Sequence, residues 1–109
     1  MKKHFIQFID DHKIWNLDLE DLIYAKSDRN YTHFYLLNGK KTIVISLNKV
    51  MTEINRFFSS TVSNFKRVGR FYIVNLAYID ILDLAKQQII LKDFVKSTLH
   101  CSRESLREL

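Results

Sequence analysis

Proline is absent from the 109-residue chain, which holds only two glycines and one cysteine. Two isolated glycines, Gly39 and Gly69, cannot form the glycine-rich loop that cradles nucleotide phosphates. The lone Cys101 excludes an internal disulfide and a zinc site built from several cysteines, and it fits a reducing compartment. We expect a buried structural thiol at this position rather than a redox-active one.

Long apolar runs and polybasic runs are also missing. No apolar stretch approaches the roughly 18 to 20 residues of a membrane helix, and acidic residues follow the N-terminal lysines too closely for a signal peptide. We therefore expect a cytoplasmic protein without membrane insertion. The 17 lysines and arginines exceed the 12 aspartates and glutamates, giving a net charge of +5 that is spread along the chain. Any anionic partner must then be met by a folded surface.

Signatures of an active site are missing as well. The histidines at positions 4, 12, 33 and 100 show no metal-ligand spacing, and no serine lies in a nucleophile elbow. The sequence therefore predicts a protein that is not an enzyme, with no catalytic residue, no cofactor and no metal.

What the chain does contain is the composition of one globular domain over residues 1–109, with 47% hydrophobic and 27% charged residues. Short β-rich runs recur throughout, and Asn38-Gly39 between two of them is a strong hairpin signal. This pattern predicts a mostly β fold, a stack of small, mainly antiparallel sheets with about 8 to 10 short strands. The expected strands span residues 4–9, 13–17, 22–26, 31–37, 41–45, 65–67, 71–75, 79–84, 88–91 and 95–101.

One central helix is expected near residues 47–58. Its apolar residues recur at a period of 3.6, which indicates core packing, and Ser46 is suited to cap its first turn. A single helical turn is expected at 76–78. A short C-terminal helix over 103–109 is expected to begin after Ser102. The apolar residues of the central helix are Leu47, Val50, Met51, Ile54, Phe57 and Phe58.

Three segments, in order, resemble a LytTR DNA-binding domain, and together they cover about residues 4–109. They are LEDLIYAKSDRNYTHFYLLNGKKTIVISLNKV, FKRVGRFYIVNLAYIDIL and HCSRESLREL. The resemblance implies a compact stack of small sheets whose loops enter successive major grooves of DNA, in a bacterial regulator. Gly69 and Phe71 stand where the family usually has histidine and serine, on either side of Arg70.

The first candidate contact loop contains Arg29, Asn30 and Tyr31, with His33 after it. Arginine can pair with guanine and asparagine with adenine in the major groove. Family position places Tyr31 where side chains reach toward bases. The structural alternative is a polar β-turn in which Asn30 supplies a left-handed residue.

The second candidate loop contains Lys66, Arg67 and Arg70. Arg70 is the strongest single candidate for a groove contact. For Arg67 we expect instead a structural salt bridge, to Glu20 or Asp21.

The third candidate loop contains Ser102, Arg103, Glu104 and Arg107. Free amides at a helix start and two arginines on one helix face suit phosphate groups. The alternative is an ordinary capped surface helix, in which Glu104 satisfies first-turn amides. Weaker phosphate candidates are Lys26 and Lys49.

Sequence-specific binding of double-stranded DNA is the function that these patterns favour. A homodimer on repeated sites and a regulatory protein partner remain open. The alternative function is a protein interaction module that uses an exposed strand edge or a face of the helix at 47–58. Placement of Arg29, Arg70, Arg103 and Arg107 on one face would favour DNA binding over this alternative.

Overall fold

A computed structural model describes residues 5–10, 12–59, 61–92 and 96–109. These residues form ten strands, two α-helices and one short 3-10 helix. The strands are β1 (Phe5–Asp10), β2 (Lys13–Asp18), β3 (Leu22–Asp28), β4 (Tyr31–Leu36), β5 (Gly39–Ile43), β6 (Phe65–Val68), β7 (Tyr72–Asn75), β8 (Ile79–Asp83), β9 (Gln88–Leu91) and β10 (Thr98–His100). The helices are α1 (Leu47–Phe57), η1 (Leu76–Tyr78) and α2 (Arg103–Arg107).

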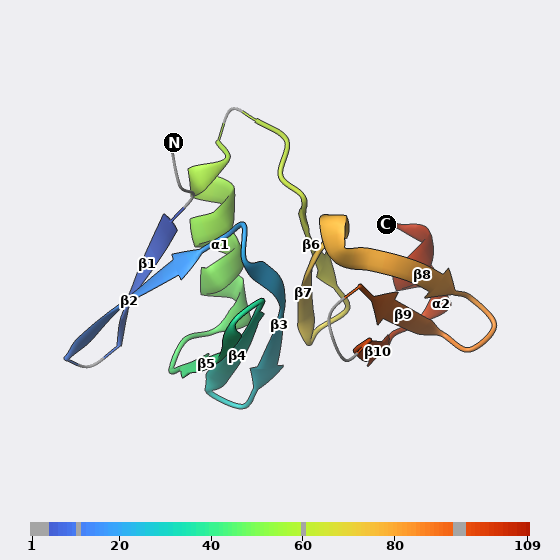
Figure 1. The fold of residues 1–109 in the computed structure, drawn as a ribbon, viewed down its shortest axis with the longest axis horizontal. Coiled ribbons are helices and arrows are strands. Elements are labelled where there is room, and N and C mark those ends of the chain that lie inside the picture. Colours follow the sequence, from blue (N-terminus) through green and yellow to red (C-terminus); the bar gives the residue numbers. More distant parts are fainter. Residues whose placement is uncertain (1–4, 11, 60, 93–95) are drawn as a thin grey trace.

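The strands form three antiparallel sheets, as Figure 1 shows along the longest axis of the molecule. A two-stranded sheet pairs β1 with β2, and a three-stranded sheet has the order β10-β9-β8. The central sheet has five strands in the order β5-β4-β3-β7-β6. The prediction of a mostly β fold built from small antiparallel sheets is confirmed.

The central sheet is buried on both faces near its middle. Ala25 and Ile73 pack in a core cluster with α1, β1 and β2, whereas Tyr24 and Val74 pack in a second cluster with β9, β10 and α2. A register shift between Leu22 and Tyr24 interrupts the regular alternation of β3. Burial on both faces explains why this strand reads as a continuous apolar run.

Helix α1 confirms the predicted central helix. The Ser46 hydroxyl accepts a hydrogen bond from the Lys49 amide at 3.2 Å, which satisfies one amide of the first turn. Leu47, Val50 and Ile54 are buried against the central sheet. The helix ends at Phe57, one residue before the expected end. No helix in the described ranges is both long and apolar enough to span a membrane.

Element boundaries differ from the predictions where turns are tight. Leu36 pairs with Gly39, so the two turn residues are Leu37 and Asn38, one position before the expected Asn-Gly. The glycine instead begins β5 with a φ of 147°. The predicted strand at 95–101 is shorter, over Thr98–His100, and its first predicted residue lies outside the described ranges.

Candidate nucleic-acid interface

The first predicted loop is a two-residue turn between β3 and β4. Asp28 pairs with Tyr31, which leaves Arg29 and Asn30 as an exposed turn. The left-handed residue is Arg29, with a φ of 57°, and not Asn30 as the sequence suggested. A positive φ is uncommon for a residue other than glycine and is favoured only where the surroundings hold it.

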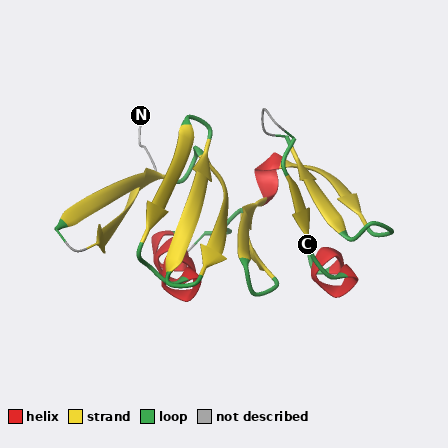
Figure 2. Cartoon of the chain, turned by 90° about the horizontal axis from the view of Figure 1, so that it is seen from below, coloured by secondary structure: helices red, strands yellow, loops and turns green. Residues whose placement is uncertain are grey.

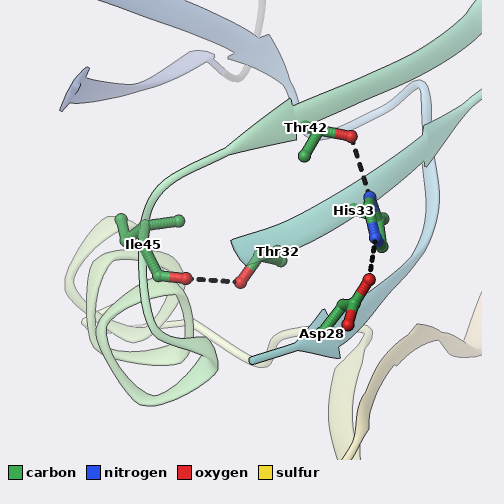
Figure 3. A network of polar contacts seen from close by, with 5 residues as sticks. All are labelled: Asp28, Thr32, His33, Thr42 and Ile45. Atoms are coloured by element: carbon green, nitrogen blue, oxygen red, sulfur yellow. Dashed lines mark hydrogen bonds and ion pairs between the residues drawn. The ribbon is translucent and has the colours of Figure 1, made fainter. Parts of the chain in front are cut away.

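Contacts on both faces of the sheet hold this turn, and Figure 3 shows them. The buried Thr32 donates its hydroxyl proton to the Ile45 carbonyl at 2.7 Å. On the opposite face the His33 ring lies between Asp28, at 3.0 Å from Nε2, and Thr42, at 2.8 Å from Nδ1. The hydrogen bond from His33 lowers the pKa of the Asp28 carboxyl.

The second predicted loop is the turn between β6 and β7. Val68 pairs with Tyr72, and Gly69 has a φ of 59°, which glycine adopts without strain. A Cβ at Gly69 would have no atom within 4 Å, so the backbone and not the available space favours glycine there. The exposed Arg70 side chain has no hydrogen-bond or ion-pair partner among the described residues.

Arg67 has the structural role expected of it, but through other partners. Its guanidinium donates to Asn48 Oδ1 on α1 at 2.6 Å and to the Arg70 carbonyl at 3.2 Å. The predicted salt bridge to Glu20 or Asp21 is therefore wrong. The sequence could not indicate this, because α1 approaches β6 only in the folded chain.

The third predicted loop leads from β10 into α2. The Ser102 hydroxyl accepts a hydrogen bond from the Ser105 amide at 3.1 Å, so Ser102 acts as the helix cap. Arg103 Nε donates to the Leu84 carbonyl at 3.2 Å, which turns part of that guanidinium toward the β8–β9 connection. Glu104 is exposed in the first turn.

These three loops meet along one edge of the molecule. The Ser27 amide at the end of β3 donates to the Phe71 carbonyl at 2.8 Å, which joins the first two loops. A cavity of about 260 Å³ lies between the second and third loops, lined by Val68–Tyr72, His100–Ser102 and Ser105. The edge is the lower one in Figure 1, and Figure 2 looks onto it from below.

Two predicted residues lie away from that edge. Lys66 pairs with Val74 inside the β6–β7 ladder, beyond the turn. Arg107 is at the far end of α2, which leads away from the edge toward the C-terminus in Figure 1. The structure therefore brings Arg29, Arg70 and Ser102 to one edge but does not place all four arginines equally close to it.

Two further residues of this edge were not among the main contact candidates from the sequence. Phe71, in the second loop, is 57% exposed, although an aromatic side chain of this size is usually buried. Lys49 lies in the first turn of α1, which begins at the same edge. The sequence did mark Phe71, because it stands where the family usually has serine. The position of Lys49 could not be predicted, because it depends on how α1 packs.

Other reactive groups do not gather into a further site within the described ranges. No group of three or more histidine, cysteine, aspartate or glutamate side chains there could hold a metal ion. Cys101 is half-buried, and this burial raises the pKa of its thiol.

Comparison with known proteins places this architecture among characterised domains. The family model described as the LytTr DNA-binding domain matches residues 12–109. A solved structure described as the LytTr DNA-binding domain of a response regulator from Bacillus cereus superimposes with a TM-score of 0.67 at 15% identity. The match covers 98% of this chain and 94% of that one. No curated protein matches the chain in sequence.

Proposed function

Because this chain belongs to the family of LytTR DNA-binding domains, we propose that it binds double-stranded DNA at particular base sequences and regulates bacterial transcription. Residues 1–109 would act as one DNA-binding domain. The observation that carries the proposal is the meeting of three polar, exposed loops along one edge. The Ser27–Phe71 hydrogen bond joins the first two loops, and the second and third loops line one cavity. Such an edge can contact DNA without a recognition helix.

Each loop offers chemistry suited to DNA. In the first turn Arg29 and Asn30 can pair with guanine and adenine edges, and Tyr31 is 47% exposed beside them. Arg70 can reach guanine, and the exposed Phe71 beside it can contact a thymine methyl group. The contact residues that we propose are Arg29, Asn30, Tyr31, Lys66, Arg70, Ser102, Arg103, Glu104 and Arg107, whereas His33 is engaged by Asp28 and Thr42 and supports the first turn.

The dimensions fit contacts in more than one groove. The longest extent of the molecule is 44 Å, and the loop edge runs along this axis in Figure 1. One turn of B-DNA is about 34 Å long, so one domain can reach from one major groove toward the next. Loops entering successive grooves would read bases at their tips, while Lys66, Arg103 and Arg107 neutralise phosphates on either side.

Selection from randomised duplex DNA, followed by footprinting, tests the proposal. A specific duplex should emerge, and its protected positions should lie on one face of the double helix. If the domain makes about 6 to 10 phosphate contacts, affinity should fall by roughly 10³ to 10⁵ between 50 and 200 mM salt. Failure of every duplex to bind, or binding that ignores salt, contradicts the proposal.

A second candidate function is regulation through a protein partner at β8. This strand lies at the edge of its sheet, and two of its residues, Ile81 and Leu82, are 49% and 38% exposed. Leu84, directly after the strand, is 43% exposed. An exposed apolar edge strand is a template for pairing with another chain. A regulatory protein that binds the parent but not Leu82→Lys, with no duplex binding by either, would favour this function over the first.

Assembly on DNA is a separate part of the proposal. A homodimer on repeated sites would give two shifted complexes on a duplex that carries two copies of the selected sequence. Sedimentation with one-site and two-site duplexes distinguishes cooperative pairing from independent binding.

A further inference from the structure

Asp28 lies beside the first of the three loops that we propose to contact DNA, where electrostatics alone does not favour a carboxylate. Asp28 is the last residue of β3, directly before the turn residue Arg29, and its side chain is 56% exposed. A carboxylate there repels the DNA phosphates that the edge is proposed to meet. A structural function of Asp28 would offset this repulsion.

The hydrogen bonds of His33 supply that function. A carboxylate only accepts hydrogen bonds, so His33 Nε2 donates to Asp28 Oδ2 at 3.0 Å. The other ring nitrogen shares a hydrogen bond of 2.8 Å with the Thr42 hydroxyl. The imidazole, whose side chain is 17% exposed, thus connects the end of β3 to β5 across β4 (Figure 3).

The turn that this connection braces is strained. Arg29 has a φ of 57°, which costs free energy for a residue that has a Cβ. The connection fixes the residue before the turn, while Thr32, bonded to Ile45, fixes the strand after it from the opposite face. With both strand ends held, the short turn has little freedom to relax.

We propose that Asp28, His33 and Thr42 form a clip that holds the Arg29–Asn30 turn ready for DNA. His33 is then a positioning residue, and the bases are contacted by the turn itself. The inference rests on the proposed DNA-binding function. Within that function His33 holds the turn in place and does not contact bases, because both of its ring nitrogens are already hydrogen-bonded to protein groups.

Two pairs of variants separate the clip from charge effects. Asp28→Ala and Asp28→Asn remove the same charge, but only asparagine keeps an oxygen that can accept from His33. Electrostatics alone predicts that both variants bind DNA more tightly than the parent. The clip predicts that Asp28→Ala binds the selected duplex about 5-fold or more weakly than Asp28→Asn. Thr42→Ser and Thr42→Val form the matched pair at the other end, with the loss expected only for valine.

Salt dependence and dynamics show whether the loss comes from positioning. Thr42→Val should weaken binding without changing the slope of log affinity against log salt, because no phosphate contact is lost. In the DNA-free protein, backbone NMR order parameters at Arg29 and Asn30 should fall in Asp28→Ala and stay near the parent values in Asp28→Asn. Glu53→Gln, on α1, controls for loss of one negative charge elsewhere.

Several results would overturn the clip. Equal or tighter binding by Asp28→Ala relative to Asp28→Asn does so, as does equal binding by the two Thr42 variants. A salt slope that falls by about 1 in His33→Ala, with Thr42→Val unchanged, would make His33 a phosphate contact instead. If the parent protein binds no duplex, the proposed DNA-binding function is wrong, and the clip, which rests on it, is overturned with it. If the parent binds, the variants test the clip separately from the proposed function.

Discussion

Arg70 and Arg67, three residues apart, are expected to respond in opposite ways to replacement by alanine. The Arg70 side chain is exposed and has no polar partner among the described residues, so Arg70→Ala should leave the free energy of unfolding within about 0.5 kcal/mol of the parent. A bidentate base contact contributes about 1–3 kcal/mol of discrimination, so affinity for the selected duplex should fall roughly 5- to 150-fold. Affinity for random DNA should change much less.

Arg67→Ala should mainly destabilise the fold. It removes the hydrogen bonds to Asn48 and to the Arg70 carbonyl, of 2.6 and 3.2 Å. At about 0.5–1.5 kcal/mol for each hydrogen bond, and toward the low end because both are exposed, the loss of stability is about 1–2 kcal/mol. Affinity should fall by a smaller factor than in Arg70→Ala, since the turn is loosened but its contact group remains.

Fluorescence anisotropy with a labelled selected duplex and urea denaturation monitored by Trp15 measure the two quantities on the same preparations. The reasoning is refuted if Arg70→Ala binds like the parent, or if it unfolds as easily as Arg67→Ala. It is also refuted if Arg70→Ala lowers affinity for random and selected DNA by the same factor, because that result marks a phosphate contact.

Four further outcomes are expected. Gly69→Ala should cost roughly 1–2 kcal/mol in urea denaturation because of its positive φ, and Gly69→Asn less, since asparagine tolerates that conformation. Asn75→Ala should cost about 1–3 kcal/mol, because a buried amide that makes two hydrogen bonds to the backbone is lost. The pKa of Asp28 is lowered, so its contribution to stability is present above the ordinary carboxyl pKa and is lost as pH falls through the folded value; NMR titration should show that pKa rise in His33→Phe. Burial raises the pKa of the Cys101 thiol, so iodoacetamide at neutral pH should modify it more slowly in the folded than in the urea-unfolded protein.

Predictions from sequence succeeded where the signal is local. The cap at Ser46 and the stripe from Leu47 to Ile54 depend on residues a few positions apart, and the helix that they predict is present. Most strands lie within two residues of their predicted limits. Turn details were less predictable: the left-handed residue is Arg29 instead of Asn30, because strand pairing, and not the preference of one residue, sets where the chain reverses.

By itself the sequence determined the fold class, the family and the loops that carry the polar contact groups. The signals for them are the alternation of apolar and polar residues, the helix caps and the order of the motifs, and each depends on residues close together in the chain. Only the tertiary structure decided which groups remain available at the edge. The pairing of β3 with β7 brings Ser27 to Phe71 and so joins two loops that are far apart in the chain. The same folding engages Arg67 with Asn48 and His33 with Asp28, while Arg70 stays exposed. Such contacts leave no local pattern, because their partners come from separate strands and helices that meet only when the core closes.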